Sequence, residues 1–155
     1  MTTTFAIRSI GQADFVQWSV LWDGYNAFYE RVGLTALAAE ITQSTSNRFF
    51  DAEEPVRALV AERNGTLLGI VHYLFHRSTL LIEQNCYLQD LFTVEAKRGQ
   101  GIGGAMIEAV YVRAREAGAT RVYWHTQETN ATARKLYDGI ADCSGFIVYR
   151  KVLQP

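Results

Sequence analysis

The pattern of apolar and polar positions divides the first third of the chain into one strand and two helices. Residues Thr4–Ile10 alternate and are rich in β-forming types, so they predict a first strand. Apolar residues recur at steps of three and four over Ala13–Val32, which predicts a helix interrupted near Gly24. A second helix is expected over Leu34–Arg48. Its apolar face consists of Leu37, Ala38 and Ile41.

The rest of the chain predicts a hairpin followed by alternating strands and helices. Two apolar segments, Val56–Arg63 and Thr66–Thr79, flank Asn64-Gly65, and both residues of that pair tolerate positive φ. The two segments should therefore form an antiparallel hairpin. The remaining elements are expected at Tyr87–Val94 (strand), Gly101–Glu116 (helix, stopped by Gly118), Arg121–Gln127 (strand), Asn130–Ile140 (helix) and Gly145–Leu153 (strand).

The predicted order, β-α-α-β-β-β-α-β-α-β, places antiparallel strands before a βαβ unit. The strands on either side of the helix in such a unit are parallel neighbours, so we expect a mixed α/β sheet rather than a doubly wound one. The 155 residues contain no repeat, linker or low-complexity stretch. We therefore expect residues 1–155 to form a single domain.

Composition narrows the classes of function. The net charge of −1 offers no basic face for nucleic acid, and no apolar run reaches the roughly 18 residues of a membrane span. The first residues lack the pattern of a signal peptide. Cys86 and Cys143 have no metal-ligand spacing, so we expect two free thiols, no metal site and a cytoplasmic location.

A glycine-rich segment, Arg98–Gly104 (RGQGIGG), lies between a predicted strand and a predicted helix. The free N–H groups of the first helical turn attract an anion, and glycines let the backbone approach it, so the segment predicts a pyrophosphate cradle. A turn that only caps the helix is one alternative. An NAD site is another, because Gly99, Gly101 and Gly104 satisfy G-x-G-x-x-G. That fingerprint belongs in the first turn of a parallel sheet, whereas a hairpin precedes it here.

Two ordered motifs carry a family resemblance. The first is Arg98–Gly103 after the strand Leu88–Val94, and the second is Asn130–Tyr137 ahead of Gly145-Phe146. Together they resemble the GNAT superfamily of N-acetyltransferases, whose signature is Arg/Gln-x-x-Gly-x-Gly/Ala. The resemblance implies a mostly antiparallel mixed sheet with a splayed parallel βαβ cofactor site. It also implies transfer of an acetyl group from acetyl-CoA to a primary amine by direct attack.

Within the superfamily, the chain resembles the diamine, polyamine and thialysine acetyltransferases and their histone and polyamine relatives. The segments that carry this likeness are Asp90–Phe92, Trp124–Gln127 and Trp22–Tyr29. It implies a small amine as acceptor, and a homodimer paired through the last strand. A protein lysine acceptor remains an alternative. So does an acyl-CoA-binding module without transfer activity, which Gln89 keeps open.

The resemblance also assigns residues to the cofactor. The amides of residues 99–104 would hold the pyrophosphate, and Phe92–Val94 would pair with the pantetheine like an added strand. The amide of Leu91 would polarise the thioester carbonyl. The expected cofactor set is Phe92, Thr93, Val94, Arg98, Gly99, Gln100, Gly101, Ile102, Gly103, Gly104, Asn130, Ala133 and Lys135.

Proton transfer requires an acid and a base. The family uses the tyrosine at Tyr137 to protonate the leaving thiolate, and a phenol keeps its proton at neutral pH. Packing is the alternative role for Tyr137, and helix capping is the alternative for Asn130. Many family members have a glutamate where this chain has Gln89. The remaining bases are Glu83, Asp90, His125, Glu128 and solvent. His125 is singled out because imidazole titrates in the useful range, and Asp90 should lie on the face opposite Gln89.

The acceptor site should come from the first helix, because the glycine loop occupies the cofactor side. A cationic amine favours carboxylates and aromatic faces. The expected acceptor set is Trp22, Asp23, Tyr25, Tyr29, Glu30 and Gln89. The same aromatic residues at helical spacing are also typical of a core.

Overall fold

The computed structural model describes residues 4–155, which form two compact units, one ending at Trp124 and the other starting at His125. The first unit contains one five-stranded sheet in the order β1-β2-β3-β4-β5. Its strands are β1 (Ala6–Ser9), β2 (Val56–Arg63), β3 (Thr66–His76), β4 (Asn85–Thr93) and β5 (Val122–Tyr123). Its helices are α1 (Phe15–Phe28), α2 (Ala39–Arg48) and α3 (Ile102–Glu116), with 3-10 turns at Gln12–Asp14, Gly33–Thr35 and Glu95–Lys97.

The sheet is mixed, as predicted. Strands β1 to β4 pair antiparallel in sequence order, and only β4 and β5 pair parallel, across the helix α3 that connects them. Asn64 and Gly65 form the hairpin turn between β2 and β3 with φ values of 51° and 81°, which confirms the predicted turn. The doubly wound parallel sheet that an NAD site would require is absent from the described residues.

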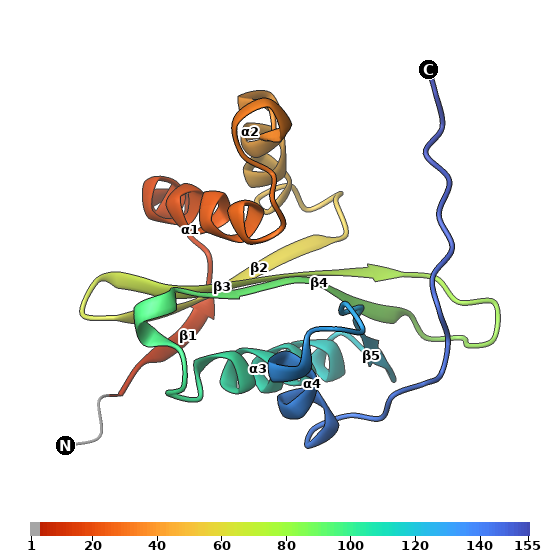
Figure 1. Ribbon diagram of the computed structural model, residues 1–155. Helices are drawn as coiled ribbons and strands as arrows, with labels where there is room; N and C mark the ends of the chain where they lie inside the picture. Colours follow the sequence, from red (N-terminus) through yellow and green to blue (C-terminus); the bar gives the residue numbers. More distant parts are fainter. Residues whose placement is uncertain (1–3) are drawn as a thin grey trace. The chain divides into compact units, whose positions relative to one another are not determined.

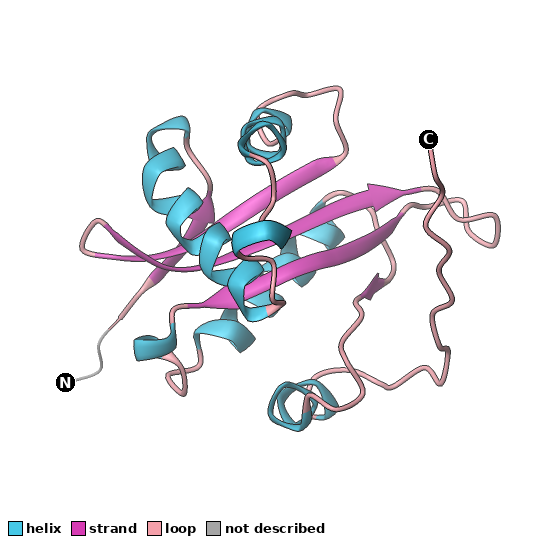
Figure 2. Ribbon diagram, turned by 45° about the horizontal axis from the view of Figure 1, so that its top comes forward, coloured by secondary structure: helices cyan, strands magenta, loops and turns pink. Residues whose placement is uncertain are grey.

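Helices cover both faces of this sheet. Figure 1 shows α1 and α2 on one face and α3 on the other, and Figure 2 shows the long strands β2, β3 and β4 side by side between them. The aromatic stripe of α1, centred on the fully buried Trp18, packs on Ala58, Val60 and Ile70. On the other face α3 buries its apolar residues, which are Ile102, Met106, Ile107, Val110 and Ala114.

Helix α1 passes through Gly24 without a break, so the predicted interruption is wrong. The reason is a close approach between the helix and the sheet. A Cβ atom built on Gly24 would lie 2.9 Å from Cζ of Phe92 on β4, well inside van der Waals contact. The glycine therefore marks the place where the helix touches the strand, and it does not mark the end of the helix.

The predicted second helix begins five residues late. Gly33–Thr35 forms a 3-10 turn, and α2 starts at Ala39. Between them the chain is extended, and Leu37 packs against the core under α1. Burying Leu37 from an extended segment takes it off the expected helical face, and Ile41 on that face is 46% exposed.

Two predicted strands are shorter or missing. The strand expected over Arg121–Gln127 is limited to Val122–Tyr123, because its ladder with β4 includes only two residue pairs. The strand expected over Gly145–Leu153 does not form, and these residues have no strand partner in the described structure. A strand persists only where a neighbour supplies hydrogen bonds, so apolar pattern alone overestimated both.

The second unit contains one helix, α4 (Ala131–Asp138), followed by an exposed segment without regular structure. Residues 130–140 were expected to form this helix, and the helix itself is confirmed. Among residues 4–155, no helix is both long and apolar enough to cross a bilayer.

The Gly24 contact leads to a stability prediction. Gly24→Val would drive a branched side chain into the Phe92 ring, and we expect the free energy of unfolding to fall by about 1–3 kcal/mol. Ala27→Val, at an exposed position of the same helix, should cost only about 0.5 kcal/mol in helix propensity. Urea denaturation would compare the two, and equal losses would show that the contact does not constrain the helix.

Candidate active site

Strand β4 loses its neighbour halfway along its length. The parallel ladder with β5 contains only Cys86 opposite Val122 and Tyr87 opposite Tyr123. The register against β3 then skips Gln89, which is the extra residue of a β-bulge. A bulge bends its strand and disrupts pairing. The β5-side edge of β4 beyond Gln89 therefore has no strand partner among the described residues.

The backbone groups of Leu91 and Thr93 face this open edge. Successive N–H groups of a strand point to opposite sides. The N–H of Val94 donates to the carbonyl of Leu68 beside β3 at 2.9 Å, so by alternation Phe92 is also directed to β3. The amides of Phe92 and Val94 are thus committed to the sheet. This corrects the expectation that all three residues of Phe92–Val94 could pair with a cofactor.

Arg98 lies at the end of the open edge. Its Nε donates to the carbonyl of Thr93 at 3.1 Å, and its guanidinium carbon lies 5.5 Å from the centre of the Phe92 ring. The ring itself packs against the core beneath α1. Arg98 therefore places a positive charge where the strand edge meets the glycine loop.

The glycine loop leaves its backbone bare. Gly99 and Gly101 have φ values of 79° and 80°, and a Cβ on either would find no atom within 4 Å. Gly101 caps α3, and the first hydrogen bond of the helix runs from the N–H of Ala105 to the carbonyl of Gly101. The N–H groups of Ile102–Gly104 in the first turn thus lack intrahelical partners. Left-handed glycines before a helix N-terminus form an anion-binding concavity.

A second cation reaches the loop from the hairpin. Nη2 of Arg63, at the end of β2, donates to Oε1 of Gln100 at 3.4 Å. Sequence reasoning did not identify Arg63, because its contact with the loop joins positions 37 residues apart. With Arg98 it gives the concavity two positive charges, which favour a phosphate ligand.

A chain of side-chain hydrogen bonds connects α1 to β4 across β3. Nε1 of Trp18 lies 3.0 Å from Nε2 of His72, and Nδ1 of His72 lies 2.9 Å from Oδ2 of Asp90. An indole nitrogen can only donate, so Nε2 accepts and the ring proton lies on Nδ1, where it donates to the carboxylate. His72, which is 3% exposed, therefore fixes the orientation of Asp90.

Asp90 also accepts a hydrogen bond from the hydroxyl of Tyr25. Burial raises the pKa of Tyr25 well above its ordinary value, and the nearby charge of Asp90 and this hydrogen bond raise it further. The hydroxyl therefore stays protonated and remains a donor. The Asp90 side chain is 13% exposed and lies on the face of the sheet that α1 covers, opposite His72 in the register.

The residues predicted on α1 divide between core and surface. Trp22 and Tyr25 are at most 9% exposed and stack with their ring centres 5.2 Å apart, so both belong to the core. Tyr29 is half-buried beside Tyr25, with ring centres 5.0 Å apart. Asp23 and Glu30 are exposed. The exposed Gln89 at the bulge belongs to none of these clusters.

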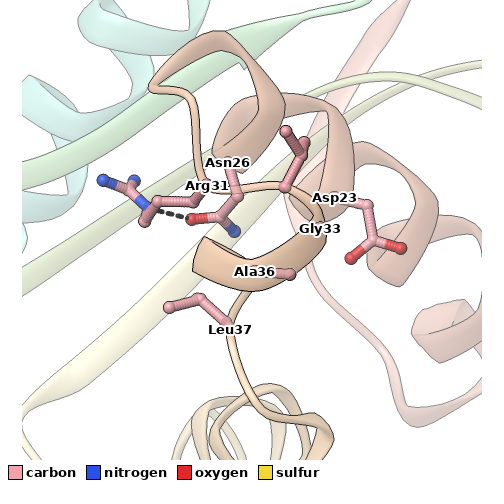
Figure 3. Close-up of a pocket in the computed structure, with 7 residues that line it drawn as sticks. Asp23, Asn26, Arg31, Gly33, Ala36 and Leu37 are labelled. Carbon is pink, nitrogen blue, oxygen red and sulfur yellow. Dashed lines mark hydrogen bonds between the residues drawn. The ribbon is translucent and has the colours of Figure 1, made fainter.

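A cavity of about 280 Å³ opens beside the C-terminal half of α1. It is lined by Asp23, Asn26, Arg31, Val32, Gly33, Ala36 and Leu37. Nε of Arg31 donates to Oδ1 of Asn26 at 2.7 Å. Figure 3 shows the guanidinium of Arg31 and the carboxylate of Asp23 pointing in opposite directions, with Asn26 between them.

The remaining expected residues lie in the second unit. Oδ1 of Asn130 accepts from the N–H of Ala133 at 3.3 Å, so Asn130 is the N-cap of α4. Tyr137 lies in the last turn of this helix, two turns after its cap, and Lys135 is exposed. His125 precedes the helix outside any strand, so its expected place on a strand is wrong.

Among the carboxylates considered as a base, the structure favours one. Glu83 lies in the connection before β4, seven residues from Asp90, which is on the order of 20 Å along an extended chain. Glu128 is exposed in a turn ahead of α4. Asp90 alone is oriented by buried donors next to the edge-facing amide of Leu91. The signal that sequence reasoning missed is His72, a polar residue inside the apolar run LLGIVHYLF.

Comparisons with known proteins agree with this geometry. A model of the acetyltransferase (GNAT) family matches residues 18–139. The D-amino-acid N-acetyltransferase HPA3 of Saccharomyces cerevisiae is 31% identical over 147 residues, covering 94% of this chain and 89% of that protein. An uncharacterized N-acetyltransferase of Bacillus subtilis, YhfO, is 28% identical and covers 92% of this chain and 94% of that protein.

The fold is shared with solved acetyltransferases. The structure of AAC(6')-Iy in complex with the bisubstrate analog CoA-S-monomethyl-acetylneamine superposes with a TM-score of 0.81 at 14% identity, covering 97% of this chain and 99% of that one. The family match covers most of the chain, and the mixed sheet with its split between β4 and β5 was predicted from the same resemblance. The chain therefore belongs to the GNAT family, whose members use acetyl-CoA as co-substrate, and it is an acetyl-CoA-dependent N-acetyltransferase.

Proposed function

We propose that this enzyme acetylates the primary amine of a small molecule, with acetyl-CoA along the open edge of β4 and the acceptor on the face covered by α1. One observation carries the proposal. The edge-facing amides of Leu91 and Thr93 are followed, after the 3-10 turn Glu95–Lys97, by a glycine loop with open backbone and a helix N-terminus. A ligand with amides at one end and phosphates at the other fits this order of groups.

The cofactor contacts follow from this placement. The amides of residues 99–104 hold the pyrophosphate, while Arg63 and Arg98 supply positive charge beside it. Thr93 pairs with the pantetheine at the strand edge. Asn130, Ala133 and Lys135 enter the cofactor set by family resemblance alone.

Strand β4 supplies the oxyanion donor and the base in this proposal, while the acid, Tyr137 on α4, enters by family resemblance alone. The N–H of Leu91 polarises the thioester carbonyl and stabilises the developing oxyanion. The amine nitrogen bonds to the acetyl carbon while the carbon–sulfur bond breaks, Asp90 accepts the proton that leaves the nitrogen, and the hydroxyl of Tyr137 gives a proton to the sulfur. Asp90 thus acts as the general base, a role that Gln89 cannot fill because an amide does not accept a proton at neutral pH. His125 is not needed in this scheme.

Small amines are the proposed acceptors, whether diamine, polyamine or amino-acid-like. The name of the 31% identical relative, a D-amino-acid N-acetyltransferase, supports amino-acid-like acceptors. The likeness to polyamine enzymes rests on shorter segments around Asp90–Phe92 and Trp22–Tyr29. Proposals of a protein lysine acceptor or of an inactive acyl-CoA-binding module gain no support from these relatives.

Assembly, domain organisation and location are also part of the proposal. We take residues 1–155 as one domain because the family match, 18–139, runs across both compact units. A homodimer would cover the apolar side chains exposed after residue 145. These are Phe146, Ile147, Val148, Tyr149, Val152 and Leu153. Cys86 and Cys143 are free, as in a reducing cytoplasm.

The acid assignment predicts a loss of rate in Tyr137→Phe. Release of free CoA thiol from acetyl-CoA would be measured against diamines, polyamines, lysine analogues, amino acids and a histone-tail peptide. With the amine class that supports turnover, the variant should lose roughly 10²-fold or more in kcat, since the leaving thiolate is no longer protonated. Equal rates in both proteins would remove Tyr137 from the chemistry. No release with any amine would contradict the proposed function.

The base assignment predicts a loss of rate in Asp90→Asn. The variant should lower kcat/KM by about 10²-fold or more, because no carboxylate then accepts the proton of the amine. Glu83→Gln, seven residues away in the β3–β4 connection, is the matched control and should behave as the parent enzyme. An unchanged kcat/KM in Asp90→Asn would exclude this carboxylate as the base.

The dimer proposal predicts a mass of twice the 17.4 kDa of one chain by light scattering at micromolar concentration. Replacing the exposed Ile147 and Tyr149 by lysine should shift the protein toward the monomer, because charges oppose burial of the segment. A monomeric mass for the unaltered chain would show that residues 145–153 do not mediate assembly.

A further inference from the structure

The strongest unexplained group outside the proposed chemistry is the side chain of Arg31. The described residues contain ion pairs for Arg8 and Arg113, whereas no carboxylate lies within 4.0 Å of Arg31. Its Nε bonds to Asn26, but Nη1 and Nη2 make no hydrogen bond to any residue from 4 to 155. An arginine carries about 2 kcal/mol of side-chain rotamer entropy, so an ordered guanidinium with an open fork requires an explanation.

Asn26 and two tyrosine rings hold the guanidinium group of Arg31 in place and leave Nη1 and Nη2 open. Asn26, only 4% exposed, anchors its amide on the carbonyl of Trp22 at 2.9 Å and accepts from Nε of Arg31 at 2.7 Å. The backbone N–H of Arg31 donates to the carbonyl of Asn26 at 2.9 Å. The guanidinium carbon also lies 5.7 Å and 5.2 Å from the ring centres of Tyr25 and Tyr29, in cation–π range. A fork fixed in this way pays little further ordering cost when it binds a planar anion.

The position of the fork relates it to the proposed chemistry. Tyr25 has its ring against the Arg31 guanidinium and its hydroxyl on the Asp90 carboxylate. The side chain of Tyr25 therefore lies between the guanidinium of Arg31 and the carboxylate of Asp90, the proposed base. Trp22 stacks on the same ring, and its buried Nε1 has no hydrogen-bond partner among the described residues. Two residues with unpaired donors, Arg31 and Trp22, thus contact the ring of the tyrosine that is bonded to the proposed base.

We propose that Arg31 binds the carboxylate of the acceptor, so that the enzyme acetylates amino acids and not diamines or polyamines. This proposal rests on the proposed function, since it places the acceptor amine at Asp90. A guanidinium accepts a carboxylate through two parallel N–H···O bonds. A polyamine, which carries only positive charge, would be repelled at this position. An acceptor with its amine at Asp90 and its carboxylate at Arg31 would reach across the Tyr25 ring.

The test compares each amino acid with its amide, which keeps the amine and removes the negative charge. Acetylation of D- and L-alanine, D- and L-phenylalanine and the matching amides would be measured with the parent enzyme and with Arg31→Gln. We expect at least 10-fold preference for the acids in the parent. In Arg31→Gln, KM for the acids should rise about 10- to 150-fold with kcat changed little, as expected for the loss of a charged hydrogen bond. The amides should be unaffected.

Two further variants separate recognition from folding. Arg31→Lys keeps the charge but not the fork, and should recover only part of the loss. Arg48→Gln, at an exposed position of α2, should match the parent. Thermal melts would be recorded for all variants. Equal use of acids and amides by the parent, or equal KM in Arg31→Gln, would overturn the proposal while leaving the acetyltransferase proposal in place.

A binding measurement distinguishes failure of this inference from failure of the proposed function. Titration of tryptophan fluorescence with the N-acetyl derivatives of the same amino acids, and with their amides, requires no turnover. Binding of the acids to the parent and weakened binding to Arg31→Gln would support the carboxylate site even if every amine failed as a substrate. Equal binding of acids and amides, or no binding of either, would overturn it.

Discussion

The hydrogen bond from Trp18 to His72 is the contact on which the arrangement of this face depends. It buries a polar pair inside an aromatic cluster, where an unpaired group would cost about 1–3 kcal/mol. Because the indole can only donate, the bond sets the proton on the far nitrogen of the ring, and that proton sets the carboxylate of Asp90. Helix α1, strand β3 and strand β4 are thus locked at one point. A small rotation of α1 would break the bond and release the carboxylate.

Strand β4 serves the site in two directions. The side chains of Asp90 and Phe92 both lie on the face that α1 covers, and the amide of Leu91 lies in the plane of the sheet toward the open edge. The bulge at Gln89 makes this possible, since one extra residue changes which backbone groups face outward. The same bulge lies two residues beyond the last pair with β5, where the open edge begins. Chemistry and access therefore come from one local irregularity.

Much of the fold could be predicted from sequence, because it rests on local signals. The Asn64-Gly65 turn, the glycine loop and α3 each have a pattern that few other structures satisfy. The failures have long-range causes. Gly24 resembles a helix break until Phe92 is placed against it, and residues 145–153 resemble a strand until a partner is sought. The apolar pattern records what a segment could bury, and does not record what lies beside it.

The candidate site shows the same division. Family motifs pointed to the glycine loop and to Leu91, while His72 and Arg31 carry no motif at all. Their importance arises from hydrogen bonds to residues on other elements or across a turn. Strand alternation predicted that Asp90 faces away from Gln89, but it did not connect that face of the sheet with the acceptor. In the structure it is the face that α1 covers. The sequence of β4 alone could not show that α1 lies over the face that carries Asp90.

The bond between Arg98 and the carbonyl of Thr93 has a consequence for the solubility of the protein. An open strand edge is a template for the edge strand of any other chain, and long bare edges promote aggregation. Here the arginine occupies the last outward carbonyl, that of Thr93, and the bulge at Gln89 interrupts the strand four residues earlier. The stretch left between them is too short to nucleate a new ladder, yet it suffices for a slender molecule with one or two amides. The enzyme can therefore keep the β5-side edge of β4 open for a ligand without exposing an edge long enough to promote aggregation.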